Sequence, residues 1–242
     1  MLHIYQNPSA ITVALAEWIT YTIETVLQTQ DRFTWVLTGG NSPKALYDML
    51  AESPYKERIA WNKLHIFWGD ERAVPFSDDR NNAKMTFDHL LNKVPVNPEQ
   101  VHVMRTDIEP EQSALEYQKM LHTYFGTEGN SFDLVLSGMG DDGHTLSLFP
   151  GTEVIHETKG WVKAFYLTAQ QMYRITLTAP VVNRASSVVF LTFGANKAKA
   201  LYEVLEGEPN ADIYPSQIIQ PASGKLHWFV DEPAAALLDK KA

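Results

Sequence analysis

The stretch FTWVLTGGNSPKALYDML, residues 33–50, joins a short β-rich apolar run, a pair of glycines and a helical pattern. FTWVL predicts a buried strand, the two glycines predict a tight turn, and KALYDML predicts the start of a helix. A strand that passes through a glycine turn into a helix is the repeating unit of α/β proteins. This stretch therefore predicts an α/β fold.

The same order of patterns returns three times along the chain, at residues 64–75, 132–144 and 187–205. The apolar runs are short and nearly continuous, as in central strands of a parallel sheet that is covered on both faces by helices. We therefore expect a mostly parallel sheet flanked by helices. Because the loops after parallel strands open on one edge of the sheet, where ligands of such proteins bind, we expect the four turns to meet there.

The remaining segments extend this architecture without dividing it. Apolar residues at spacings of three and four predict a helix over 8–28, and residues 161–167 and 226–233 look like further strands, the last followed by a short Ala and Leu helix. Residues 73–97 are rich in Pro, Asn and Asp, which favours a long functional loop with a modest helix. With no domain boundary visible, we expect one α/β domain over residues 1–242.

The composition excludes several classes of protein. The hydrophobic share is 45% and the formal net charge is −9, with a pI near 5.3, which disfavours nucleic acid as a partner. There is no cysteine, so disulfides and thiolate metal sites are excluded. The N-terminal residues lack the pattern of a signal peptide, and no apolar run approaches the length of about 20 residues that a membrane span needs. We expect a soluble, cytoplasmic protein without a membrane or nucleic-acid partner.

The first turn contains Gly39, Gly40, Asn41 and Ser42. Its glycines let the backbone approach a ligand while the next helix presents unpaired N–H groups, so it is a candidate phosphate cradle. The alternative is an ordinary strand-to-helix turn, with Ser42 as N-cap and Pro43 at the first helical position.

The second turn places Asp70, Glu71 and Arg72 directly after an apolar strand. Arg72 is a candidate donor to a carboxylate, a phosphate or a developing oxyanion. The alternative is that one of the two acids forms a surface ion pair with this arginine, which contributes little energy.

The third turn, GMGDDGHT at 138–145, matches the G-x-G-x-x-G pattern of a dinucleotide site. We reject that interpretation because no long helix follows and no acid ends a second strand at the spacing required for a ribose contact. The turn instead pairs Asp142 with His144. The near-neutral pKa typical of histidine suits a general base acting on water, and the aspartate would orient the ring, although a lone histidine is often structural.

Two cations, Arg174 and Lys197, lie near the expected strand ends and are candidate phosphate ligands, although each alone is compatible with a solvated side chain. The chain has no serine-hydrolase elbow, no nucleotide P-loop and no H-E-x-x-H zinc motif. We therefore expect chemistry without a metal or cofactor.

Taken in order, five segments resemble the signature series of the 6-phosphogluconolactonases: TGGNSPKALY, IFWGDERAVPFSDDRNNAKM, FDLVLSGMGDDGHTLSLFPG, RITLTAPVVNRA and FGANKAKAL. The resemblance implies the fold of the glucosamine-6-phosphate deaminases and hydrolysis of 6-phosphoglucono-δ-lactone to 6-phosphogluconate in the oxidative pentose phosphate pathway. It implies a small phosphorylated sugar lactone as the partner, no cofactor, and a monomer or small homo-oligomer.

The resemblance also implies roles for individual residues. His144 would be the general base with Asp142 beside it, and Arg72 would contact the lactone or its oxyanion. The substrate and its phosphate would be held by Gly39, Gly40, Asn41, Ser42, Asp70, Arg174 and Lys197. The sequence departs from the usual pattern at two places, since Asn41-Ser42 stands where Ser-Thr is typical and Leu146 replaces a small residue.

Two other functions stay open. A deaminase or isomerase of phosphorylated sugars would use Asp70 as an enolisation base, but Arg72 departs from the deaminase pattern of an acidic pair followed by an aromatic residue. A sugar-phosphate-sensing module would need an attached DNA-binding segment, for which the chain has neither the length nor the charge.

Overall fold

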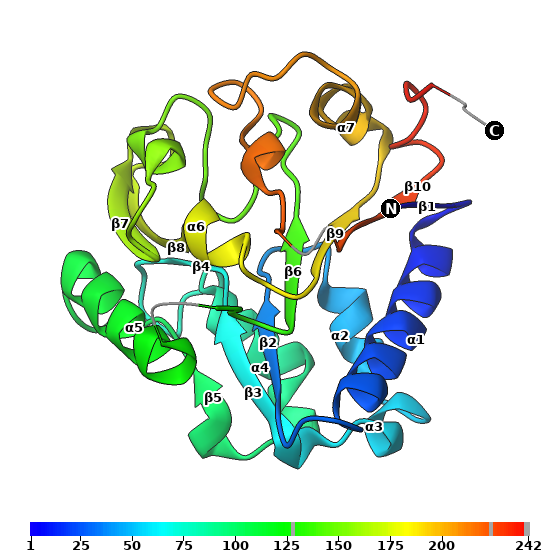
Figure 1. Cartoon of the computed structure of the whole chain (residues 1–242), viewed down its shortest axis with the longest axis vertical. Helices are drawn as coiled ribbons and strands as arrows, with labels where there is room; N and C mark the ends of the chain where they lie inside the picture. The colour runs from blue at the N-terminus through cyan, green and yellow to red at the C-terminus, as the bar shows by residue number, and fades with distance from the viewer. Residues whose placement is uncertain (127–128, 223–224, 240–242) are drawn as a thin grey trace.

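The computed structural model describes residues 1–126, 129–222 and 225–239. Within these residues, seven strands form a parallel sheet that runs through the centre of the molecule (Figure 1). In spatial order its strands are β1 (Leu2–Tyr5), β10 (Leu226–Asp231), β9 (Val188–Thr192), β6 (Leu134–Gly138), β2 (Phe33–Leu37), β3 (Leu64–Trp68) and β5 (Val101–His102). The predicted α/β fold with a mostly parallel sheet is confirmed.

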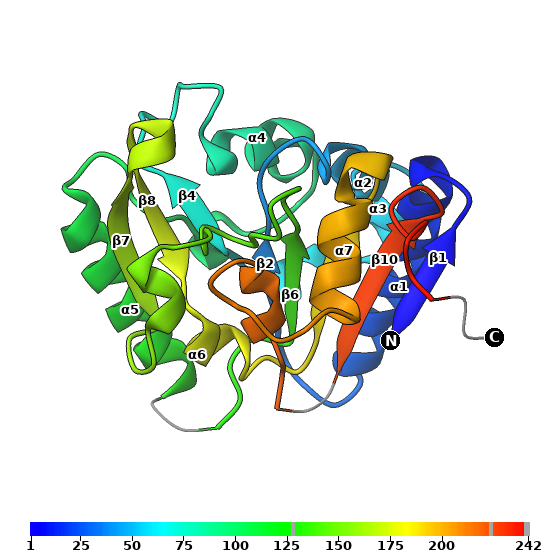
Figure 2. The same ribbon diagram turned by 90° about the horizontal axis from the view of Figure 1, so that it is seen from above.

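A second, antiparallel sheet was not predicted. Its strands, in spatial order, are β4 (Asp70–Arg72), β8 (Met172–Leu177) and β7 (Val162–Leu167). The charged triplet expected to form a turn is thus a short strand, in which Arg72 pairs in register with Arg174. Figure 2 shows β7 and β8 next to helix α5 (Pro110–Phe125), to one side of the main sheet.

The other α-helices are α1 (Pro8–Val26), α2 (Lys44–Leu50), α3 (Tyr55–Arg58), α4 (Asn82–His89), α6 (Ala179–Val182) and α7 (Ala198–Leu205). Short 3₁₀ turns are η1 (Trp61–Lys63), η2 (Leu91–Lys93), η3 (Pro98–Gln100), η4 (Glu153–His156), η5 (Thr168–Gln170), η6 (Ala195–Lys197) and η7 (Pro215–Ile218). Helix α1 begins where the Asn7 side chain accepts the N–H of Ala10, with Pro8 at the first helical position. No helix in the described part of the chain is long and apolar enough to cross a membrane.

The two faces of the main sheet are covered differently. Trp35 and Ile66 point to a core shared with α1, α2 and α4, whereas their neighbours Val36 and Phe67 point to a core on the opposite face. This alternation follows from the two-residue period of a strand. The second core is closed by α5, α6 and α7, so helices flank this face as expected, and by the antiparallel sheet, which was not expected.

One further expectation differs from the structure, and two elements were not predicted. The helix expected after the last strand is absent from the described residues, because 232–237 form successive turns, and helix α5 and strand β1 were not predicted. The segment 73–97 contains α4 and η2, in agreement with a long loop that carries a modest helix.

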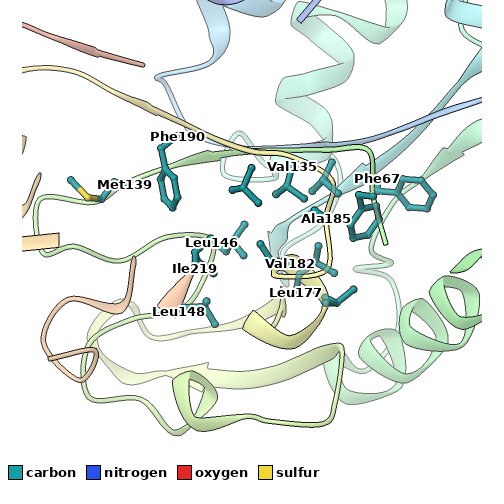
Figure 3. Close-up of a cluster of buried hydrophobic side chains, with 14 of the residues drawn as sticks. Phe67, Val135, Met139, Leu146, Leu148, Leu177, Val182, Ala185, Phe190 and Ile219 are labelled. Atoms are coloured by element: carbon teal, nitrogen blue, oxygen red, sulfur yellow. The ribbon is translucent and has the colours of Figure 1, made fainter. Parts of the chain in front are cut away.

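The loop after β6 is anchored in the second core. Figure 3 shows Leu146 and Leu148 among buried side chains that include Val182 and Ile219. Leu146 has φ 54°, in the left-handed region that a leucine adopts only when its surroundings hold it there. A Cβ at position 69 would collide with this leucine, so the loop packs directly on the backbone that follows β3. The loop that carries the candidate histidine is therefore held by apolar packing.

Candidate active site

A cavity of about 240 Å³ lies at the carboxyl ends of β2, β3, β6 and β9. Its position agrees with the expectation that the four turns meet at one edge of the sheet. The predicted residues that line it are Gly39, Gly40, Asn41, Ser42, Asp70, Arg72, His144, Arg174 and Lys197. Asp142 does not line the cavity, but it is hydrogen-bonded to His144, which does.

His144 and Asp142 form a hydrogen-bonded pair at this wall. The His144 Nδ1 lies 2.5 Å from Asp142 Oδ1, and the imidazole stacks on the ring of Phe149 with 4.1 Å between centroids. Burial would raise the pKa of Asp142, but its hydrogen bonds and charge interaction with His144 outweigh this effect and lower it. Because an ionised carboxylate only accepts, Nδ1 carries the proton and Nε2 is left as the basic nitrogen.

Backbone contacts fix the loop around this pair. The N–H of Gly140 donates to the carbonyl of His144 at 2.8 Å, and the Thr145 hydroxyl donates to the carbonyl of Gly138 at 2.9 Å. A Cβ at position 140 would collide with both the imidazole and the Asp142 carboxylate. A glycine is therefore required at this position for the pair to form.

Asp70 and Arg174 form a buried polar group beside the histidine. Arg174 is 3% exposed, its Nη1 lies 3.8 Å from Asp70 Oδ2, and it also donates to Gln170. The Ser147 hydroxyl donates to the same Asp70 oxygen at 2.6 Å. Burial lowers the pKa of Arg174, and the charge of Asp70 opposes that shift. Arg174 was expected at the end of a strand, but it lies inside β8 and already has these partners.

Glu71 is a buried carboxylate that sequence reasoning left as a surface ion-pair partner. It is 1% exposed and accepts the backbone N–H groups of Arg72, Asn82 and Ala83 at 2.7–2.8 Å. It therefore fastens β4 to the first turn of α4. Burial raises the pKa of Glu71 to about 7, although these three hydrogen bonds oppose the shift.

The hydrogen bonds of the Glu71 carboxylate are here called the Glu71 clamp. Arg72 follows Glu71 in the chain, and its side chain lines the cavity. Its Nη1 donates to the carbonyl of Arg80 at 2.7 Å, and its buried Nε has no hydrogen-bond partner among the described residues. The ion pair considered between Arg72 and a neighbouring acid is not formed in the described part of the chain. Its remaining donors are therefore available to a ligand.

The glycine turn and Lys197 also line the cavity. Asn41 and Ser42 are exposed, and α2 begins at Lys44 with Pro43 in the capping position and no side-chain cap. The alternative interpretation of Ser42 as the N-cap of this helix is therefore wrong. Lys197 ends η6 and is half-buried, and within 1–126, 129–222 and 225–239 it has no ion-pair partner.

The charges at the cavity contrast with the chain as a whole. Three cationic side chains line it against one carboxylate, Asp70, in a protein whose formal net charge is −9. A concave site with this excess of donors favours an anion. In the described residues, no group of three or more His, Asp or Glu side chains is arranged to hold a metal ion.

Several lining residues were missed by sequence reasoning, among them Asn82, Phe149 and Gln170. The first two lie in the segments RNNAKM and TLSLFP that carry the family resemblance, so their place in those motifs could have identified them as site residues. Gln170 lies between β7 and β8 in η5, and no local pattern distinguishes it.

The sequence from residue 6 to 228 matches the family described as glucosamine-6-phosphate isomerases/6-phosphogluconolactonase. The chain belongs to this family. A relative named 6-phosphogluconolactonase from Nostoc sp. is 37% identical over 243 residues, which cover 98% of each protein. The family description names two reactions, isomerisation and lactone hydrolysis. The match to the family alone therefore does not say which of the two reactions this chain catalyses.

Solved structures of the family share the architecture. The 6-phosphogluconolactonase of Trypanosoma brucei superposes with a TM-score of 0.86 at 26% identity, over 98% of each chain. A monomeric glucosamine-6-phosphate deaminase superposes with a TM-score of 0.84 at 18% identity, which establishes a common fold. The predicted likeness to the deaminase fold is confirmed.

Proposed function

We propose that this chain hydrolyses 6-phosphoglucono-δ-lactone to 6-phosphogluconate, a step of the oxidative pentose phosphate pathway. The observation that carries the proposal is that His144, paired with Asp142, lines the same cavity as Lys197 and the glycine turn at 39–42. The cavity thus combines a base with donors for a phosphate. The Nostoc relative of 37% identity supports the same reaction.

In this mechanism, His144 Nε2 takes a proton from water as the water oxygen attacks the lactone carbonyl carbon. The Asp142 carboxylate keeps the other ring nitrogen protonated and stabilises the imidazolium that forms. The ring C–O bond then breaks, the proton returns to the departing ring oxygen, and the products are a carboxylic acid and a hydroxyl group. No further reactant is needed for this balance.

Arg72 serves in this proposal as a donor to the carbonyl oxygen, where negative charge develops. Its side chain lines the cavity, and the hydrogen bond from its backbone N–H to Glu71 fixes its backbone. Preorganised donors of this kind stabilise a transition state without rearranging when charge forms.

The phosphate is assigned to the glycine turn and Lys197, with Arg174 as a further cation. Backbone N–H groups at the start of a helix and a free ammonium group are suitable ligands for a phosphate dianion. Binding energy from this distant group holds the lactone at the histidine and thereby raises kcat/KM for the phosphorylated substrate.

The decisive experiment measures lactone hydrolysis, corrected for the spontaneous reaction, with phosphorylated and unphosphorylated gluconolactone in parallel. We expect turnover of the phosphorylated lactone and a much lower kcat/KM for the other. Equal kcat/KM values for the two lactones would refute the assigned phosphate site. If the protein accelerates the hydrolysis of neither lactone, the lactonase assignment is refuted. Binding of the phosphorylated sugar acid without turnover would instead favour a sensing module.

The isomerase alternative is tested in the same preparation with glucosamine 6-phosphate. That reaction needs Asp70 as a base, whereas Asp70 Oδ2 already accepts from Ser147 and faces Arg174. We therefore expect no ammonia, and its release at a rate comparable with lactone hydrolysis would overturn the choice.

A further inference from the structure

The loop that carries His144 is held by a segment far along the chain. Residues 210–218, here called the brace, include η7 and lie beside this loop (Figure 1). Ser216 of the brace is 1% exposed and donates twice to the carbonyl of Gly143, from its N–H at 2.9 Å and from its hydroxyl at 2.8 Å. This carbonyl belongs to the peptide group that joins Gly143 to His144. The brace therefore contacts the backbone of the proposed base directly.

The peptide group between Gly143 and His144 is fixed at both ends. Its oxygen accepts from Ser216, and its N–H donates to Asp142 Oδ1 at 3.1 Å. The same Asp142 oxygen is hydrogen-bonded to the His144 ring. Because a peptide group is planar, its oxygen and its N–H turn as one unit, and a rotation that breaks one bond also weakens the other. The contact between Asp142 and the imidazole thus depends on the bonds from Ser216.

The brace contacts the loop at two further points. Gly143 has φ 77°, in the left-handed region that favours glycine, and a Cβ at this position would lie 2.8 Å from Cδ1 of Tyr214. Further along the loop, the N–H of Gly151 donates to the carbonyl of Asp212 at 3.0 Å. The brace therefore holds the chain before and after His144.

No residue of the brace lines the cavity, so an effect of the brace on the reaction must act through the loop. We propose that Ser216 is a positioning residue: by holding the Gly143 carbonyl, it keeps the His144 imidazole where it takes a proton from water. This inference rests on the proposed function. A general base acts only within hydrogen-bond reach of the proton, and a displacement of about 1 Å can lower the rate by about 10²-fold. Because the phosphate is assigned to other residues, Ser216 acts on the chemical step and not on substrate binding.

The test is Ser216→Ala, which removes the hydroxyl but keeps the backbone N–H. We expect kcat for 6-phosphogluconolactone to fall by about tenfold to a hundredfold, because the imidazole is less well placed. KM should stay within about twofold of wild type. The midpoint of thermal unfolding should fall by about 2–4 °C, the effect of one hydrogen bond in a protein of this size.

Ser131→Ala is the matched control. Ser131 is also buried, at 7% exposed, and it also donates to backbone carbonyls from both its N–H and its hydroxyl, at 2.9 Å and 2.7 Å. These carbonyls belong to Arg184 and Val181, away from the loop that carries His144, and Ser131 does not line the cavity. We expect a similar fall of the unfolding midpoint, with kcat and KM within about twofold of wild type.

Hydrogen exchange measured by mass spectrometry tests the brace without substrate. The backbone amides of residues 138–151 should exchange faster in Ser216→Ala than in wild type or Ser131→Ala, because the loop opens more often. Ser216→Cys provides a second variant if Ser216→Ala does not fold. Cysteine is close to serine in size and is a weak donor, so we expect changes of kcat and exchange in the same direction.

Two results would overturn the inference: a kcat of the Ser216 variants no lower than that of Ser131→Ala, or an effect of the Ser216 variants on KM alone. In either case the role of Ser216 would be structural and not one of positioning. The rate of the wild-type protein separately tests the proposed function. If wild type does not accelerate lactone hydrolysis, the exchange comparison still applies, and unchanged exchange at residues 138–151 in the Ser216 variants refutes the brace.

Discussion

Two groups of residues that line the cavity are built in opposite ways. One group, here called the buried wall, consists of residues 138–149 with β4, and its polar side chains are mostly buried and bonded to one another. The other, here called the open wall, consists of residues 39–43 and η6, where Asn41, Ser42 and the residues before Lys197 are exposed. The same cavity thus has one preorganised group of lining residues and one group without a comparable network.

This difference separates two requirements of catalysis. Groups that act on the reacting atoms must be held in place before substrate arrives, because reorganisation during the reaction costs rate. Groups that bind a distant phosphate contribute to affinity, and they can be exposed to solvent before the ligand binds. We therefore expect substitutions in the buried wall to change kcat or stability, and substitutions in the open wall to change KM.

The largest effect is expected at the group that the buried wall presents to the substrate. His144→Gln should lower kcat by about 10²- to 10⁴-fold, the usual contribution of a general base, while unfolding by urea stays within about 1 kcal/mol of wild type. His156→Gln is the matched control, because His156 also pairs with an aspartate, at 3.0 Å, but is exposed and outside the cavity. Equal kcat values for the two variants would remove His144 from the mechanism.

The next effect concerns stability and pH at the clamp beneath Arg72. The pKa of Glu71 is about 7 in the folded chain against 4.5 for an ordinary glutamate, so the folded state binds this proton more tightly. Its contribution to stability is complete below about pH 4.5 and is lost as pH rises through 7, by about 3 kcal/mol in all. Urea unfolding at pH 5 and pH 8 should show this loss in wild type and a smaller loss in Glu71→Gln. Identical pH dependence in both proteins would contradict it.

A smaller effect is expected on the open wall. Lys197→Ala should raise KM for the phosphorylated lactone by about tenfold to a hundredfold, the value of a hydrogen bond to a charged group, with little change in kcat. Activity on unphosphorylated gluconolactone should not change. Lys199→Ala, at an exposed neighbouring lysine that does not line the cavity, is the control. A loss confined to kcat would place Lys197 with the chemistry and break the distinction between the walls.

The smallest effect is expected at Ser42. Its hydroxyl is exposed and does not cap α2, and in our proposal the backbone N–H groups of the turn share the phosphate with it. Ser42→Ala should therefore raise KM by about two- to fivefold and leave stability unchanged, as measured by steady-state kinetics and thermal unfolding. A change above about 100-fold would show that the side chain, and not the backbone, carries the phosphate site.

The sequence was sufficient to predict that the residues of the candidate site lie close together, and the reason is physical. Four apolar runs each ended at a glycine turn, and parallel strands bring such turns together at one edge. Gly39, Arg72, His144 and Lys197 consequently line one cavity, as expected from their places after strands. Their individual roles remain predictions.

What the sequence did not reveal depends on contacts between distant segments. Asp70 and Glu71 looked like exposed turn residues because nothing local indicated that β8 would pair with them. Strand β1 forms only because β10, at the other end of the chain, provides its hydrogen-bonding edge. Helix α5 did have a local signal, since Pro110 opens it and Ala114, Tyr117 and Leu121 follow at helical spacing.

Leu146 has a consequence for redesign of substrate choice. Its side chain both lines the cavity and belongs to the second core, and its backbone is held in the left-handed region. Replacing it by glycine relieves backbone strain of about 1–3 kcal/mol but removes packing on the order of 2–5 kcal/mol. Widening the site for bulkier sugars at this position therefore needs a compensating larger side chain elsewhere in the same core, for example at Ala185 or Val182.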